Sequence, residues 1–96
     1  MTDSALIADI ARSMGEPARV AILGALQAAP ERSAGELTEI AGLAPSTVSE
    51  HLGKLVTTGL ITVRADGRKR LYRLADPEVG ALLGTIRALA QTLGRA

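Results

Sequence analysis

Two short helical patterns separated by a glycine, within residues 36–58, restrict the possible fold more than any other feature of this chain. Leu37 and Ile40 lie one turn apart in the first pattern. Gly42 can adopt the left-handed conformation that ends a helix, and Pro45 suits the first position of the next one. In the second pattern, four apolar residues recur at helical spacing and are expected to face inward: Val48, Leu52, Leu55 and Val56. The segment therefore predicts a helix-turn-helix.

Further start and stop signals flank this motif. Ser33 suits the N-cap of the first helix, because Glu36 follows three residues later, as in a capping box. Gly59 ends the second helix. Leu43 is expected to pack into the core between the two helices, and residues 30–33, which begin with proline, predict a loop before the first helix.

The outward side of the second helix is polar and carries side chains that suit nucleic acid. Hydroxyl groups in the first turn of a helix bond phosphates or base edges, a Glu accepts from cytosine N4, and a Lys reaches phosphates. We therefore expect contacts to duplex DNA from Ser46, Thr47, Ser49, Glu50 and Lys54. Simpler interpretations stay open for three of them. Ser46 and Thr47 are also common helix caps, and Glu50 is equally interpreted as a solvated charge that phosphates repel.

A basic β-hairpin is expected directly after the helix-turn-helix, over about residues 60–74. Its strands alternate apolar and polar side chains, and Asp66-Gly67 is a strong signal for a tight turn. Residues 45–73 hold six basic and two acidic residues, a net charge of +4, whereas residues 1–44 hold three and six, a net charge of −3. A localised basic patch of this kind can bind phosphates, unless it is merely a solvated loop. The cations expected to do so are Arg64, Arg68, Lys69 and Arg70.

The terminal segments carry more apolar surface than a 96-residue monomer can cover. Helices are predicted at about residues 4–14, 17–28 and 77–93, and the first and last of these are strongly apolar on one side. Small single domains are marginally stable alone, so this surface favours a homodimer. The residues expected at the seam are Leu6, Ile7, Ile10, Val79, Leu82, Leu83, Ile86, Leu89 and Leu93.

The composition restricts the kinds of chemical site that this chain can form. The chain has no Cys and one His, which excludes disulfides and thiolate sites, so neither a metal nor another cofactor is expected. Ser49, Glu50 and His51 are adjacent on a helix and do not face one another, so no catalytic triad follows and no enzymatic activity is expected. Charged residues interrupt the N-terminal segment, and no apolar run is long enough to span a membrane. A soluble, cytoplasmic protein is expected.

Three blocks of residues, in order along the chain, resemble the ArsR family, also called ArsR/SmtB, of small winged helix-turn-helix bacterial regulators. They are GEPARVAIL at residues 15–23, STVSEHL at 46–52 and KRLYRL at 69–74, and the resemblance covers roughly residues 5–90. It implies a mainly α fold of five helices, with a small β-hairpin, the wing, between the last two. It also implies DNA contact by His51, because the family commonly has a His there. Otherwise His51 is interpreted as a half-buried helix residue.

The chain departs from the family pattern at three places. Residues 33–35, Ser-Ala-Gly, replace the family's metal-sensing Cys-Val-Cys, so thiolate sensing of arsenite is not expected. The last helix offers Asp76 and Glu78 without a His, which makes a poor zinc or nickel site. Pro45 occupies a position that is often Gln in relatives, so one base-reading side chain is missing.

The sequence is thus interpreted as one domain, residues 1–96, of a homodimeric, sequence-specific DNA-binding transcriptional regulator that acts as a repressor. Its operator would be an inverted repeat with half-sites about one helical turn apart. One rival interpretation is a protein-interaction module in which the last helix docks a partner. Another is a regulator with a small apolar effector against Gly80, Gly84 and Ala88, which otherwise allow close packing at the seam.

Overall fold

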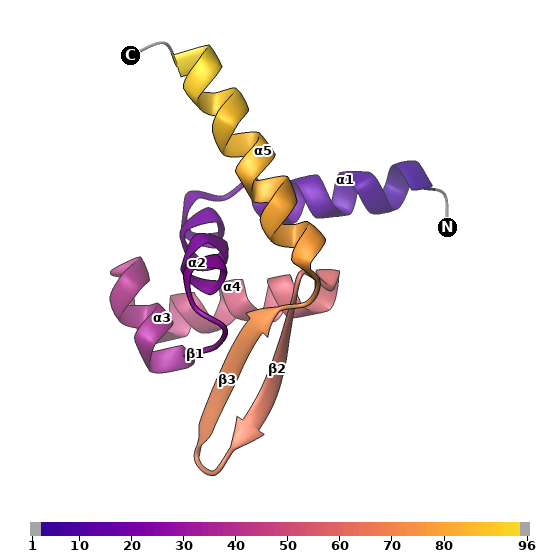
Figure 1. The fold of residues 1–96 in the computed structure, drawn as a ribbon. Helices are drawn as coiled ribbons and strands as arrows, with labels where there is room; N and C mark the ends of the chain where they lie inside the picture. The colour runs from indigo at the N-terminus through magenta and orange to yellow at the C-terminus, as the bar shows by residue number, and fades with distance from the viewer. Residues whose placement is uncertain (1–2, 95–96) are drawn as a thin grey trace.

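A computed structural model describes residues 3–94 and shows five helices and three short strands in this part of the chain (Figure 1). The elements in order are α1 (Asp3–Met14), α2 (Pro17–Ala28), β1 (Arg32–Ser33), α3 (Ala34–Ala41), α4 (Pro45–Thr58), β2 (Ile61–Asp66), β3 (Lys69–Leu74) and α5 (Pro77–Gly94). The expected order of helices and hairpin is confirmed. The two-stranded sheet expected from the sequence is extended by β1.

The three strands form one antiparallel sheet in the order β1-β3-β2. The prediction of a loop over residues 30–33 is therefore wrong in its last two residues, because Arg32 pairs with Tyr72 and Ser33 with Leu71. A strand of two residues is too short to show an alternating pattern. Its pairing depends on the tertiary placement of α2 and α3 beside β3, which local sequence does not reveal.

The caps of α3 and α4 follow the sequence signals closely. The Ser33 hydroxyl accepts from the Glu36 amide at 3.1 Å, and the Ser33 amide donates to Glu36 Oε1 at 2.8 Å, so the predicted capping box is confirmed. The hydrogen bonds from the Ser33 backbone and hydroxyl lower the pKa of Glu36. Gly42 and Gly59 end α3 and α4 in the left-handed region, with φ of 66° and 91°.

The core lies between α2, α3, α4 and the inner face of the sheet, and the start of α5 closes it. Its largest fully buried side chains are Ile22, Leu23, Leu37, Val48, Leu52, Leu55, Ile61 and Leu83. Leu43, expected in the core, lies in the turn between α3 and α4 and is 39% exposed. That prediction is wrong.

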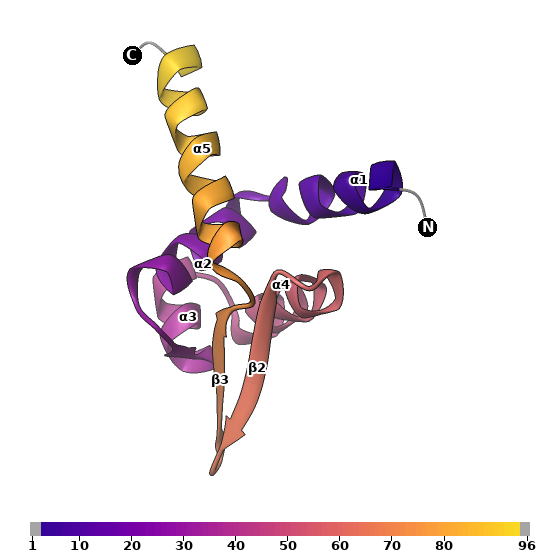
Figure 2. The same cartoon turned by 45° about the vertical axis from the view of Figure 1, so that its right-hand side comes forward.

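The helices α1 and α5 project from this body in different directions (Figures 1 and 2). Only Met14, near the end of α1, is buried, whereas in α5 the buried residues are Val79, Gly80 and Leu83, all in its first half. Within residues 3–94, no helix combines the length and the apolarity needed to cross a membrane. The two projecting helices therefore present apolar surface to solvent in the single chain.

Candidate nucleic-acid interface

One side of α4 is fixed firmly to the core. Val48, Leu52 and Leu55 are almost completely buried, and they recur at the spacing of one face of a helix. The opposite side is therefore held at a defined orientation to solvent. A rigid helix with one free polar side has the geometry that a recognition helix needs in a major groove.

The predicted contact residues divide into two groups on this helix. Ser46, Ser49, Glu50 and Lys54 are exposed, whereas Thr47 and His51 are half-buried at the borders of the free side. Among the described residues, no hydrogen bond or ion pair occupies the side chains of the four exposed residues. These four groups are available to an external partner.

The N-terminus of α4 is not capped by a side chain. Its N-cap is Ala44, which makes no side-chain cap hydrogen bond, and Pro45 follows at the first helical position. The alternative interpretation of Ser46 and Thr47 as caps of this helix is therefore wrong. The first turn of α4 therefore has no side-chain cap, and Ser46 in this turn is exposed, an arrangement that favours a phosphate.

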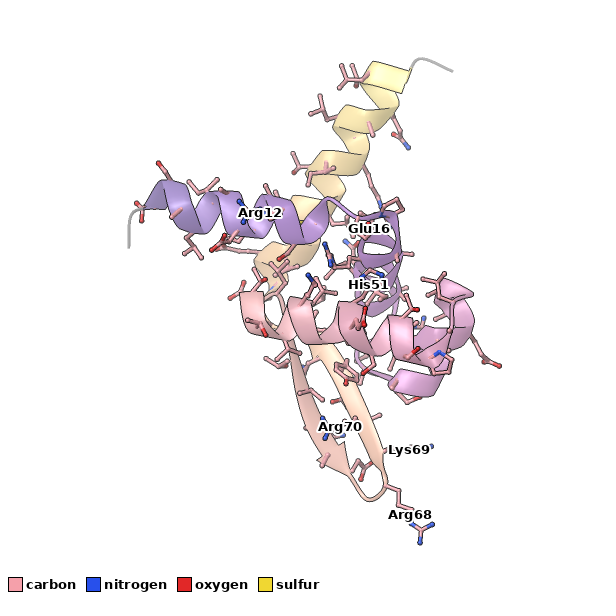
Figure 3. All side chains as sticks on the ribbon, turned by 180° about the vertical axis from the view of Figure 1, so that it is seen from behind. Arg12, Glu16, His51, Arg68, Lys69 and Arg70 are labelled. Carbon is pink, nitrogen blue, oxygen red and sulfur yellow. The ribbon has the colours of Figure 1, made fainter. Side chains whose placement is uncertain are left out.

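The hairpin β2–β3 carries its cations around a tight tip. The chain reverses at Gly67-Arg68, where Gly67 has a φ of 62°. Arg68 points away from the body at the tip (Figure 3). Ala65 pairs with Arg70 and Asp66 with Lys69, so Arg70 shares the inner face of the sheet with Tyr72 while Lys69 lies on the outer face. The three predicted tip cations are all exposed and are presented in three directions.

Arg64, the fourth predicted hairpin cation, has a partner within the protein. Its Nε donates to Glu31 Oε2 at 2.8 Å and its Nη2 donates to Glu31 Oε1 at 2.9 Å, a two-point ion pair across 33 residues. This pair ties β2 to the segment before β1. It lowers the pKa of Glu31 and raises that of Arg64. Sequence reasoning missed Glu31, since neither its spacing nor its neighbours mark it as a partner of the hairpin.

This ion pair predicts a local acid transition. The folded pKa of Glu31 lies below its ordinary value of 4.5, so the pair contributes above that value and is lost as the pH falls through the lower folded pKa. The nitrogen shift of Arg64 Nε should therefore titrate below pH 4.5 in an NMR series. The Glu31→Gln variant is the control and should show no such step. A midpoint above 4.5, or an identical step in the variant, would contradict the assignment.

His51 lies on the edge of α4 that faces α1 and α2, away from the hairpin tip (Figure 3). Its Nδ1 is 3.4 Å from Nη1 of Arg19 in α2. His51 is half-buried, as the alternative interpretation expected, and its ring also has a polar partner in Arg19. Arg19 is a second residue near the interface that sequence reasoning missed.

The predicted seam residues also divide into two groups. Val79 and Leu83 are 8% and 1% exposed in the single chain, so they belong to its core and offer little surface to a partner. They lie on the side of α5 that packs against α2 and the core. Ile10 is half-buried against the core. The remaining residues are 39–64% exposed: Leu6, Ile7, Leu82, Ile86, Leu89 and Leu93.

The small residues of α5 have unequal surroundings. Gly80 is buried beneath Gln27, whose Nε2 donates to the Gly80 carbonyl oxygen at 3.1 Å. At Gly84, an added Cβ would meet nothing within 4 Å. A ligand against Gly80 would have to displace Gln27. Separately, residues 3–94 contain no group of three or more His, Asp or Glu side chains that could hold a metal ion.

Comparison with known proteins places this geometry in a family. The family model described as "Helix-turn-helix domain" matches residues 14–64, which is more than half of the chain. The HTH-type transcriptional regulator YgaV of Escherichia coli is 38% identical over 80 residues, covering 83% of this chain and 81% of YgaV. The chain belongs to the ArsR family of winged helix-turn-helix transcriptional regulators.

Two further comparisons are informative. A probable mercury resistance operon repressor of Streptomyces lividans is 37% identical over 79 residues, or 82% of this chain and 62% of that protein. The solution structure of the homodimeric winged helix-turn-helix DNA-binding domain of Mb0332 from Mycobacterium bovis, a possible ArsR-family regulator, has a TM-score of 0.87. It covers 100% of this chain and 94% of that one at 24% identity, so it supports the fold alone.

Proposed function

We propose that this ArsR-family chain is a homodimeric repressor that binds an inverted-repeat DNA operator. Helix α4 lies in a major groove and the hairpin lies on the flanking backbone. Two observations support the choice of surface. Ser46, Ser49, Glu50 and Lys54 have no partner within the described part of the chain, and the hairpin beside them presents three exposed cations. The unpartnered polar side of α4 is the observation that carries the proposal.

The dimer is supported by the exposed apolar side chains of α1 and α5. Burying a Leu or Ile side chain completely contributes about 1.5–3 kcal/mol, so a seam of six half-exposed residues from each of two copies can stabilise a dimer. One relative, the probable mercury resistance operon repressor of Streptomyces lividans, supports repression, and we propose that the dimer acts by blocking access of RNA polymerase to the promoter. Half-sites about one helical turn apart would match a two-fold axis between two α4 helices.

Selection of bound duplexes from a random pool tests this function directly. We expect enriched sequences with two-fold symmetry. Binding should weaken as the salt concentration rises, because protein cations displace counterions from the DNA phosphates. The rival interpretation, a protein-interaction module of the same fold, predicts neither enrichment nor salt-sensitive binding. Gel-shift assays of the selected duplex against a scrambled one would measure the difference.

Transition metals are not expected to control this repressor. The chain has no Cys and a single His, and thiolate and imidazole are the ligands that metal sensors of this kind need. Adding zinc, nickel or arsenite at micromolar concentration should leave operator affinity unchanged in gel shifts. A loss of about tenfold at stoichiometric metal, well above assay scatter, would contradict this expectation and imply ligation by carboxylates with His51.

A further inference from the structure

Arg19, in the first turn of α2, connects three helices. Its Nε donates to the backbone carbonyl oxygen of Ser13 at 2.6 Å, and its Nη1 lies 3.4 Å from Nδ1 of His51. Ser13 is the penultimate residue of α1. Its carbonyl oxygen is therefore one of the last four in the helix, which accept no hydrogen bond from an amide of the same helix. Arg19 therefore caps the C-terminal end of α1 with a cation, which the helix dipole favours, while it contacts the middle of α4.

A second link joins the same end of α1 to the end of α4. Ser13 Oγ and Thr58 Oγ1 are 2.6 Å apart, and Thr58 Oγ1 donates to the Lys54 carbonyl oxygen at 2.9 Å. A hydroxyl has one proton, so Thr58 accepts in the first contact and Ser13 donates. The C-terminal turn of α1 is thus attached to α4 at two points, Thr58 directly and His51 through Arg19.

The contact with Arg19 restricts the chemistry of His51. A guanidinium group has donors and no acceptor, so Nδ1 of His51 must be the acceptor. A ring that accepts at Nδ1 is neutral and has its proton on Nε2. The free Nε2–H group can then donate to a phosphate oxygen or to the O6 and N7 acceptors of guanine. It cannot serve as an acceptor for a base amino group.

We propose that Arg19 is a positioning residue of the DNA interface. It holds His51 as a neutral ring that donates through Nε2, and it fixes α4 to the end of α1. Because α1 also contributes exposed apolar side chains to the proposed seam, this link relates the orientation of α4 to that of the dimer. The inference rests on the proposed function only for its consequence in DNA binding. The state of the His51 ring is a property of the free protein.

The first test therefore needs no DNA. Since His51 is the only histidine in the sequence, its ring nitrogens can be assigned without ambiguity in an ¹⁵N-labelled sample of the full chain. At about pH 8, where free imidazole is neutral, we expect well-separated shifts with Nδ1 unprotonated and Nε2 protonated. Averaged shifts, or a proton on Nδ1, would overturn the proposal. This measurement uses the unsubstituted protein, so it stands even if a variant fails to fold.

The second test compares substitutions in the operator selected above. Arg19→Ala removes both contacts, and Arg19 borders an open groove between α1 and α4, so no enclosed cavity results. We expect a dimer with averaged His51 tautomers and an operator affinity reduced about tenfold. Arg19→Lys keeps the charge but has one nitrogen for two acceptors, so the tautomer preference should be lost there as well. Arg12→Ala, which removes an exposed cation of α1, is the matched control and should change neither property.

The outcomes separate this inference from the proposed function. A fixed tautomer in a protein that selects no DNA would refute the function and leave the Arg19–His51 contact in place. Selective DNA binding with averaged tautomers in the unsubstituted protein would refute the role of Arg19 alone. If Arg19→Ala keeps the tautomer and weakens binding to the operator and to scrambled duplex equally, Arg19 acts only as a general cation and the positioning role is wrong.

Discussion

The double substitution of Ile86 and Leu89 by Asp should convert the protein to monomers and abolish selective DNA binding. Both side chains are exposed in the single chain, at 43% and 55%, so their replacement leaves the protomer core intact. Four carboxylates at a two-fold seam would be desolvated without partners, which opposes association. A monomer engages one half-site at a time, and losing the linked second site should lower operator affinity at least about a hundredfold.

Sedimentation analysis and gel shifts on the selected operator would measure the two effects. The matched comparison is Leu89→Asp against Gln91→Asp, because each adds one negative charge to α5. Gln91 lies on the opposite side of the helix from Leu89, given the helical periodicity of 100° per residue. The Gln91 variant should remain dimeric and bind the operator normally. A monomeric unsubstituted protein at micromolar concentration, or a dimeric double variant, would exclude this seam.

Helix boundaries were predictable because their signals are local. Pro45 and Gly59 mark the ends of α4 through backbone preferences that hold in any fold, and the Ser33–Glu36 capping box is complete within four residues. The basic tip was predictable for the same reason, since Asp66-Gly67 specifies the turn that exposes it. The exposed side of α4 followed from its apolar periodicity.

The misplaced or missed residues depend on contacts between distant segments. Glu31 and Arg64 are 33 residues apart, and Arg19 and His51 are 32 apart, so no local pattern relates them. The broad apolar face of α5 contains two adjacent surfaces, one that packs against the core and one that stays exposed, where we propose the dimer seam. Periodicity alone could not show that Leu83 is buried and Leu82 exposed. The packing of α2 against the start of α5 decides which of the two side chains is buried.

The two parts of the proposed interface differ in how firmly the protein holds them. The hairpin cations lie on a narrow two-stranded extension, whereas Ser49 lies on a helix that three buried side chains attach to the core. A firmly held group can discriminate between bases, because a wrong base leaves its hydrogen bond unmade. A cation on an extended tip can follow the phosphates of any sequence. Sequence reading should therefore depend on α4 and general affinity on the hairpin.

Ser49→Ala should accordingly weaken operator binding by about 1–3 kcal/mol for each lost base contact while affinity for scrambled duplex stays unchanged. Arg68→Ala should weaken both duplexes about equally. In a dimer it should also reduce the slope of log affinity against log salt by about two, because each lost phosphate contact contributes about 0.9. Affinities for both duplexes at several salt concentrations measure these quantities, with Arg12→Ala as the control for loss of a cation remote from the hairpin. If Arg68→Ala lost selectivity while Ser49→Ala lost only general affinity, base reading would belong to the hairpin and phosphate contact to α4.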